Sequence, residues 1–150
     1  MKVLAVSISE RKGIKKHPVE YIELIEDYGI DGDAHAGKWH RQVSLLGVES
    51  MEAMKKKLPE LSAGDFAENI LTEGIVLYKL PIGTILKVGE CILEVTQIGK
   101  ECHLGCEIRH IVGDCVMPRE GIFTKVLKGG KIKADDKIEI VKKLIIVLKY

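Results

Sequence analysis

Short apolar runs alternate with glycine-rich polar stretches along the chain. Several runs are rich in valine and isoleucine and too short for most helices, which is the pattern of β-strands. We predict strands over residues 2–9, 19–25, 41–46, 84–88, 91–98, 122–127 and 137–141. Gly89 and Glu90 separate two of these runs. Because glycine permits a tight turn, this pair predicts a β-hairpin.

One helix is predicted over residues 48–58, where Met51, Met54 and Leu58 share a face. Acidic residues precede the lysines in this segment, as the helix dipole favours. A second short helix is predicted over about 106–112. The regular alternation of strands and helices that marks a doubly wound sheet is missing. We therefore expect a mainly β protein, a barrel or a sandwich, with one or two short helices.

The composition indicates one globular domain with a small partner. The chain has 150 residues, 46% of them apolar and 30% charged, and no apolar run is long enough to span a membrane. The formal net charge is +1 and aromatic residues make up 5%, which argues against a dedicated nucleic-acid binder. The apolar stretch at 3–8 is too short for a signal peptide, so we expect a cytoplasmic protein.

The C-terminal residues 142–150 read KKLIIVLKY, a β-prone apolar run flanked by lysines. Such charges guard an exposed strand against aggregation. We therefore divide the chain into a domain over 1–141 and an extension over 142–150, which we predict to be an added edge strand. A strand that forms a homodimer is the alternative, so both a monomer and a homodimer remain open.

The chain has four cysteines. In a cytosolic protein these thiols are kept reduced. Strand alternation places Cys91 on an apolar face, which predicts a buried and inert thiol. Cys102, Cys106 and Cys115 lie instead in polar, glycine-containing sequence near several basic residues. Neighbouring cations lower the pKa of a thiol, and a thiolate can carry a persulfide or bind a soft metal. Two alternatives are plain structural thiols and a zinc site made by Cys102, Cys106, His110 and Cys115.

A second polar constellation covers residues 29–42. Its small residues let the backbone approach a ligand, and basic side chains supply donors suited to an anion. These are His35, Lys38, His40 and Arg41. The glycine spacing matches neither a Walker A motif nor a dinucleotide fingerprint. The histidines could instead ligate a metal or act as a general base, or the loop could simply be solvated.

A third polar loop, at 63–72, contains Glu68 and Asn69. Their side chains could either orient a ligand or bond the backbone of the turn. Neither a nucleophilic serine motif nor a well-spaced pair of carboxylates appears, so the sequence does not indicate acid–base hydrolysis.

Taken together, the polar loops resemble the MOSC family, which is named for the C-terminal domain of molybdenum cofactor sulfurases. The resemblance spans about residues 2–141 and is closest to the small stand-alone bacterial members. The matching segments are GDAHAG at 32–37, HRQVSLL at 40–46, GDFAEN at 64–69, LPIG at 80–83 and GDCVMPREGIF at 113–123.

The resemblance implies a closed or partly open β-barrel that handles the molybdenum cofactor or its sulfur. Cys102, with Cys115 as second candidate, would carry sulfur as a thiolate or persulfide, and Cys102 would ligate molybdenum where the metal is bound. Glu68 and Asn69 would orient the pterin ring. The residues implied to anchor the phosphate and pterin of molybdopterin are His35, Lys38, His40, Arg41 and Arg119.

The resemblance also implies partners. Larger MOSC proteins carry a pyridoxal-phosphate cysteine desulfurase domain, which 150 residues cannot contain. We therefore expect a separate cysteine desulfurase as sulfur donor and a molybdoenzyme or cofactor-biosynthesis protein as recipient. The activity would then be sulfurtransferase-like. The alternatives are a non-catalytic molybdopterin carrier and a molybdenum-dependent reductase of N-hydroxylated bases.

Overall fold

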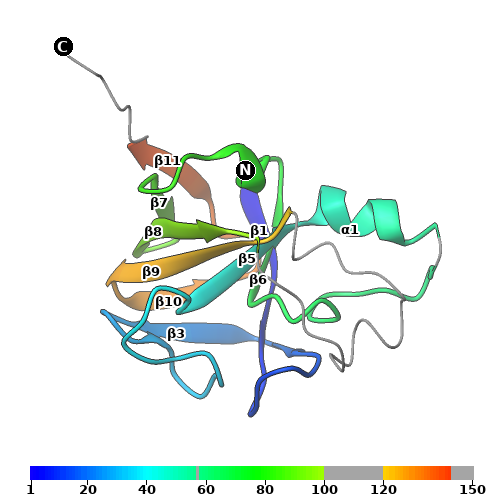
Figure 1. The fold of residues 1–150 in the computed structure, drawn as a ribbon, viewed down its shortest axis with the longest axis horizontal. Coiled ribbons are helices and arrows are strands. Elements are labelled where there is room, and N and C mark those ends of the chain that lie inside the picture. The colour runs from blue at the N-terminus through cyan, green and yellow to red at the C-terminus, as the bar shows by residue number, and fades with distance from the viewer. Residues whose placement is uncertain (57, 100–119, 143–150) are drawn as a thin grey trace.

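The computed structural model describes residues 1–56, 58–99 and 120–142, which form a mainly β structure (Figure 1). Its helical elements are α1 (Val48–Met54) and the short 3₁₀ helix η1 (Leu77–Lys79). The strands are β1 (Lys2–Ile8), β2 (His17–Val19), β3 (Tyr21–Ile25), β4 (Gly29–Ile30), β5 (Val43–Gly47), β6 (Ile70–Glu73), β7 (Ile85–Val88), β8 (Cys91–Ile98), β9 (Ile122–Lys128), β10 (Gly130–Lys133) and β11 (Ile138–Lys142).

Two sheets build the fold. The larger has eight strands in the order β11-β7-β8-β9-β5-β6-β1-β2, and the smaller has the order β10-β3-β4. Within the described strands β5 and β6 pair in parallel, while the other pairs are antiparallel. A bridge from Lys2 to Lys137 connects β1 to the start of β11. The larger sheet therefore curls round into a partly open barrel (Figure 1), which confirms the predicted fold class.

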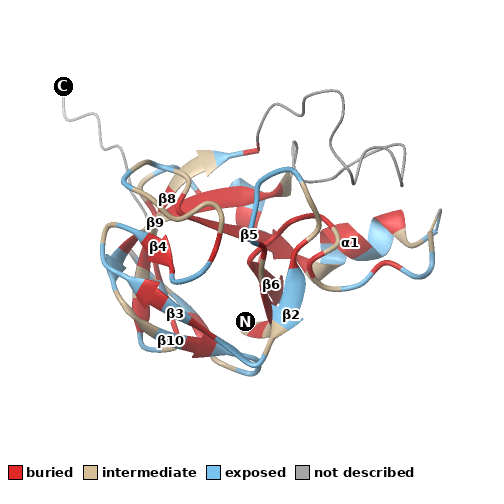
Figure 2. Cartoon of the chain, turned by 90° about the horizontal axis from the view of Figure 1, so that it is seen from below, coloured by how far each residue is buried: buried red, intermediate tan, exposed pale blue. Residues whose placement is uncertain are grey.

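The core follows from the alternation of side chains along the strands. In β8 the odd positions from Cys91 to Val95 are buried and the residues between them are less so. One apolar cluster, which includes Val43, Leu45 and Leu93, fills the inside of the curled sheets. A second cluster lies under α1 and includes Leu46 and Met51. β5 is buried along its whole length because its two faces contribute to different clusters (Figure 2).

The predicted strand at 91–98 agrees with β8 at both ends. The predicted strand at 19–25 is divided at Glu20 into β2 and β3. Residues 70–72 were predicted to be part of a loop, but together with Glu73 they form β6, which pairs with β1 and β5. The two-residue β4 and the alternating β10 were also missed.

The predicted helix at 48–58 is shorter in the structure, because α1 ends at Met54. A single turn follows, in which the N–H of Leu58 donates to the carbonyl of Met54. Pro59 prevents the helix from resuming after Leu58, since the residue before a proline disfavours helical backbone. The predicted helix at 106–112 and extension strand at 142–150 lie outside the described residues, apart from the last residue of β11. Within the described parts, no helix is long and apolar enough to cross a membrane.

Candidate functional site

A buried ion pair joins the loop after β1 to the loop after β4. The Lys16 ammonium lies 2.8 Å from Asp33 Oδ1, and both side chains are 0% exposed. The same nitrogen lies 3.0 Å from Ser9 Oγ and 3.1 Å from His35 Nδ1. A buried pair of charges is tolerated when further hydrogen bonds satisfy both ions.

Asp33 completes this network through the backbone. Its Oδ1 accepts the N–H of Ser9 at 3.0 Å, and its Oδ2 accepts the N–H of His35 at 3.1 Å. The carboxylate therefore holds two loops that are 24 residues apart in the sequence. This fixes the backbone on which His35 stands, at the start of the basic segment.

Trp39, the single tryptophan of the chain, lies beside His35. Its indole N–H donates to the His35 carbonyl at 2.7 Å, and the two rings are parallel with centroids 6.3 Å apart. The Lys12 ammonium and the Arg41 guanidinium lie 4.5 and 4.7 Å from the Trp39 ring centroid. These distances are within the range of cation–π interactions. The indole thus gathers two cations next to His35.

The Arg41 side chain contacts a second aromatic ring and has a buried N–H donor. Its guanidinium also lies 5.6 Å from the Phe123 ring centroid. Its Nε is buried and has no hydrogen-bond partner among the described residues. A guanidinium stays charged and carries five N–H donors, so a buried donor without an acceptor suits an anion such as a phosphate.

Lys38 and His40 are exposed. Lys38 lies near Asp27, whose pKa is lowered mainly by hydrogen bonds from Gln42 and Lys125, with a weaker charge effect from Lys38. His40 Nε2 lies 2.8 Å from Gln97 Oε1 at the end of β8, and the hydroxyl of Thr96 donates to the His40 carbonyl. The structure therefore places His35, His40 and Arg41 around Trp39.

The start of β9 lies beside the end of β8, close to His40. The N–H of Gly99 donates to the carbonyl of Gly121 at 2.7 Å, and Ile98 pairs with Ile122. Gly99 and Gly121 therefore lie side by side, and Gly99 is two residues beyond Gln97 of β8. Cys102, Cys115 and Arg119 lie outside the described residues, and so do the other members of the zinc alternative, Cys106 and His110.

Glu68 and Asn69 bond backbone groups inside the protein. The two oxygens of Glu68 accept the N–H groups of Gly64 and Phe66, at 2.7 and 3.2 Å. Asn69 accepts the N–H of Ser44 and donates to the Ser7 carbonyl. Both side chains are buried, so of the two roles left open by the sequence, the structure shows the bonding of turn and strand backbone.

Sequence reasoning missed Lys16, Trp39 and Gln97 as parts of this group. Trp39 stands inside the basic segment and is the chain's single tryptophan, which is a signal that could have marked it. Nothing local marks Lys16 or Gln97.

Cys91 is fully buried, and burial raises the pKa of its thiol to about 12, with Glu90 contributing. The prediction that Cys91 is a buried core thiol is confirmed.

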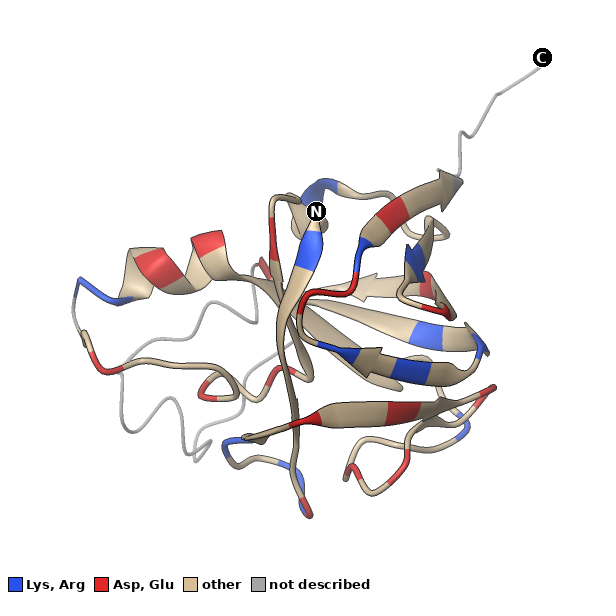
Figure 3. Ribbon diagram, turned by 180° about the vertical axis from the view of Figure 1, so that it is seen from behind, with Lys and Arg blue, Asp and Glu red and all other residues tan. Residues whose placement is uncertain are grey.

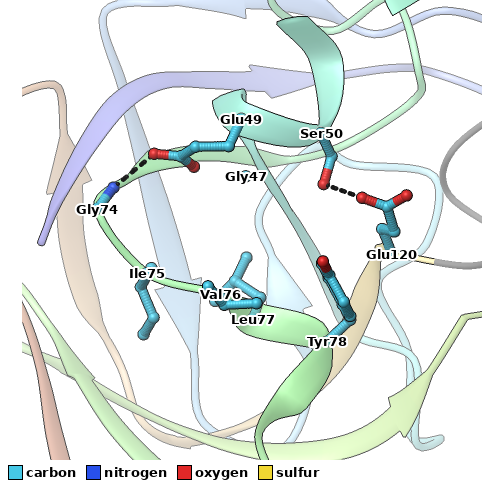
Figure 4. Close-up of a pocket in the computed structure, with 9 residues that line it drawn as sticks. All are labelled: Gly47, Glu49, Ser50, Gly74, Ile75, Val76, Leu77, Tyr78 and Glu120. Atoms are coloured by element: carbon cyan, nitrogen blue, oxygen red, sulfur yellow. Dashed lines mark hydrogen bonds between the residues drawn. The ribbon is translucent and has the colours of Figure 1, made fainter. Parts of the chain in front are cut away.

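A cavity of about 190 Å³ lies beyond the opposite end of β5, between the start of α1 and η1 (Figure 4). Two hydrogen bonds join groups in its wall: Glu49 accepts the N–H of Gly74, and Ser50 donates to Glu120 at 2.6 Å. Two carboxylates in its wall do not suit an anion. None of the predicted site residues lines this cavity.

Charge elsewhere is mixed. Figure 3 shows strands that carry lysines beside strands that carry acidic residues at the back of the molecule, and Lys131 of β10 lies opposite Glu23 of β3. Several of these pair, for example Lys125 with Asp27 and Lys133 with Asp136. Within the described ranges, no group of three or more His, Cys, Asp and Glu side chains could hold a metal ion. The cluster around Trp39 thus stands out by its cations and its unsatisfied donor.

Solved structures share this fold. YuaD from Bacillus subtilis superposes with a TM-score of 0.75 at 19% identity, over 91% of this chain and 93% of YuaD. YiiM from Geobacillus stearothermophilus gives 0.73 at 18%, over 94% and 75% of the two chains. YiiM from Escherichia coli gives 0.69 at 20%, over 96% and 71%. At these identities the likeness establishes the fold alone.

A comparison with curated proteins finds no match. The family model of the MOSC domain matches residues 32–139, which is more than half of the chain and includes the His35–Arg41 segment, α1 and the strands β5 to β10. Together with the partly open β-barrel, this match shows that the chain belongs to the MOSC family.

Proposed function

We propose that this domain binds the molybdenum cofactor through its phosphate at the cluster around Trp39, and that Cys102 presents a thiolate or persulfide to the molybdenum. The MOSC family is associated with molybdenum cofactor binding and sulfuration. The observation that carries the proposal is the buried Arg41 Nε without a hydrogen-bond partner among the described residues.

The described side chains fit the proposed cofactor chemically. A phosphate needs cations and N–H donors, and Arg41 supplies both at a partly buried position. Lys12 and His40, which lie against the Trp39 ring, add exposed donors at the rim of the same cluster. The molybdenum of the bound cofactor would supply a soft centre that accepts a sulfur ligand.

The place of Cys102 in the sequence supports its proposed sulfur role. Cys102 is three residues from Gly99, so covalent geometry limits the distance between their Cα atoms to about 11 Å. Gly99 itself is two residues from Gln97, the partner of His40. The sequence therefore connects Cys102 to the proposed phosphate site through few residues. Cys115 remains the second candidate, and Arg119 a further anchor for the phosphate.

The sulfur step needs a donor protein. The Cys102 thiolate would attack the outer sulfur of a persulfide on a separate cysteine desulfurase, the donor's thiolate would leave, and Cys102 would become the persulfide. Basic neighbours favour this step because they hold the attacking thiol as a thiolate. The described residues contribute the phosphate anchors, which keep the acceptor in place for transfer.

Phosphate recognition is tested with Arg41→Met, using the fluorescence of the single tryptophan as readout. Inorganic phosphate should change the Trp39 emission, and the variant should bind about 10- to 100-fold more weakly, as loss of a charged hydrogen bond implies. Lys128→Met is the matched control, because it removes one exposed positive charge at the end of β9. Equal affinity of both variants for phosphate would contradict the assignment.

Sulfur transfer is tested with Cys102→Ser. Mass spectrometry of the native protein, after incubation with a cysteine desulfurase and cysteine, should show one added sulfur atom that the variant lacks. Cys106→Ser is the control, and Cys115→Ser tests the second candidate. The Cys102 variant should still bind phosphate. If it reactivates a desulfo-molybdoenzyme as well as the unchanged protein does, the sulfur role is wrong.

A further inference from the structure

We propose that Lys16 is a positioning residue that holds the His35 ring as the neutral tautomer with its proton on Nε2. His35 then offers an N–H donor to an anionic ligand. The role of that donor rests on the proposed function, whereas the tautomer is a property of the protein without ligand.

The geometry around the ammonium supports this assignment. A lysine ammonium has three donors and no acceptor. Lys16 Nζ has acceptors at 2.8 Å in Asp33, at 3.0 Å in Ser9 and at 3.1 Å in His35 Nδ1. A proton on Nδ1 would face the ammonium hydrogens. Nδ1 therefore accepts, and the ring proton lies on Nε2.

Asp33 does not offer His35 a competing partner for Nδ1. The nearest carboxylate oxygen, Oδ2, lies 3.8 Å from Nδ1, which is too long for a hydrogen bond. That oxygen already accepts the backbone N–H of His35 at 3.1 Å. The hydroxyl of Ser9 donates to the Arg11 carbonyl, so its oxygen is an acceptor for Lys16. These bonds give a direction to the hydrogens that join Lys16 to Ser9 and to His35.

Burial makes the arrangement rigid. The side chains of Lys16 and Asp33 are 0% exposed, while that of His35 is 18% exposed. The backbone N–H of Lys16 donates to the Gly64 carbonyl at 2.9 Å, which anchors the lysine to the loop before β6. The His35 ring in turn lies parallel to Trp39, within 6°. Lys16 thus acts on a ring that is held parallel to Trp39.

The tautomer is measured directly in the unaltered protein. Long-range ¹H–¹⁵N spectra at pH 8, above the ordinary histidine pKa of about 6.5, distinguish the two nitrogens of each ring. His35 should favour the Nε2–H form by at least about tenfold, the ratio expected for one charged hydrogen bond. Exposed His17 is the internal control. A proton on His35 Nδ1, or the same mixture as His17, would overturn the proposal.

Two variants test the role of Lys16. Lys16→Met leaves the Asp33 carboxylate as the nearest partner of Nδ1, so the His35 proton should move to Nδ1. Lys16→Arg restores a donor and should restore the Nε2–H form. An unchanged His35 spectrum in folded Lys16→Met would refute the proposal. If that variant does not fold because the buried carboxylate is uncompensated, the measurement on the unaltered protein decides by itself.

Inorganic phosphate separates this proposal from the proposed function. Added phosphate should shift the Nε2 signal of His35 and leave His17 unchanged, and Lys16→Arg should bind it more tightly than Lys16→Met. If phosphate affects neither His35 nor Trp39, the phosphate site is refuted while the tautomer result still stands. If phosphate shifts His35 in its Nδ1–H form, the phosphate site stands and the role of Lys16 is refuted.

Discussion

Replacing Glu68 by glutamine should change how the stability of the fold depends on pH. Glu68 lies in the loop before β6, and the residue is 1% exposed. Burial raises its pKa from the ordinary 4.5 to about 7, because the interior disfavours the charged form. Hydrogen bonds from the backbone of Gly64 and Phe66 oppose this rise without cancelling it.

The direction and size of the change in the free energy of unfolding follow from proton linkage. Below pH 4.5 the group is protonated in both the folded and the unfolded chain, so its contribution to stability is complete. Between pH 4.5 and about 7 only the unfolded chain has released the proton, so the free energy of unfolding falls as pH rises. Above pH 7 the contribution is lost, and the total difference is about 3 kcal/mol. Glutamine does not ionise and removes this dependence.

Urea unfolding at several pH values between 4.5 and 8 measures the effect. The free energy of unfolding of the unaltered protein should fall relative to Glu68→Gln by about 3 kcal/mol across this range. Glu60→Gln, at an exposed position, is the matched control and should run parallel to the unaltered protein. Parallel profiles for Glu68→Gln, or a relative gain of the unaltered protein as pH rises, would refute the reasoning.

Three further predictions concern the packing around the site. Gly64→Ala should lower the free energy of urea unfolding by at least about 3 kcal/mol, because the added Cβ would lie 2.1 Å from the Lys16 carbonyl oxygen. Gly13→Ala places its Cβ in open space and should lower that free energy by only about 1 kcal/mol. Asn69→Ala should cost about 3 kcal/mol, since it removes buried hydrogen bonds to Ser44 and Ser7, and a loss below 1 kcal/mol in thermal or urea unfolding would contradict this. Cys91 should escape alkylation by iodoacetamide at pH 8 until urea unfolds the protein, and mass mapping that shows rapid modification of the folded chain would disprove its burial.

The candidate site was only partly readable from the sequence. His35, His40 and Arg41 stand within seven residues, so their basic character was visible as one segment. Lys16 reaches Asp33 and His35 from 17 and 19 residues away, and no local pattern indicates that contact. The two readings of Glu68 were equally compatible with the sequence, because an acidic side chain in a glycine-containing loop does not show whether it faces a ligand or the loop's own backbone.

Strand identity was determined by the sequence where side chains alternate strongly, as in β8, and helix α1 was marked by its apolar face. The physical reason is that both periods are local properties of the backbone. Tertiary structure alone decided that residues 70–73 form β6, because that run becomes a strand by pairing with β1 and in parallel with β5. It also decided the surroundings of the cations: Asp33 neutralises Lys16 from a distant loop, and the buried Nε of Arg41 has no hydrogen-bond partner among the described residues.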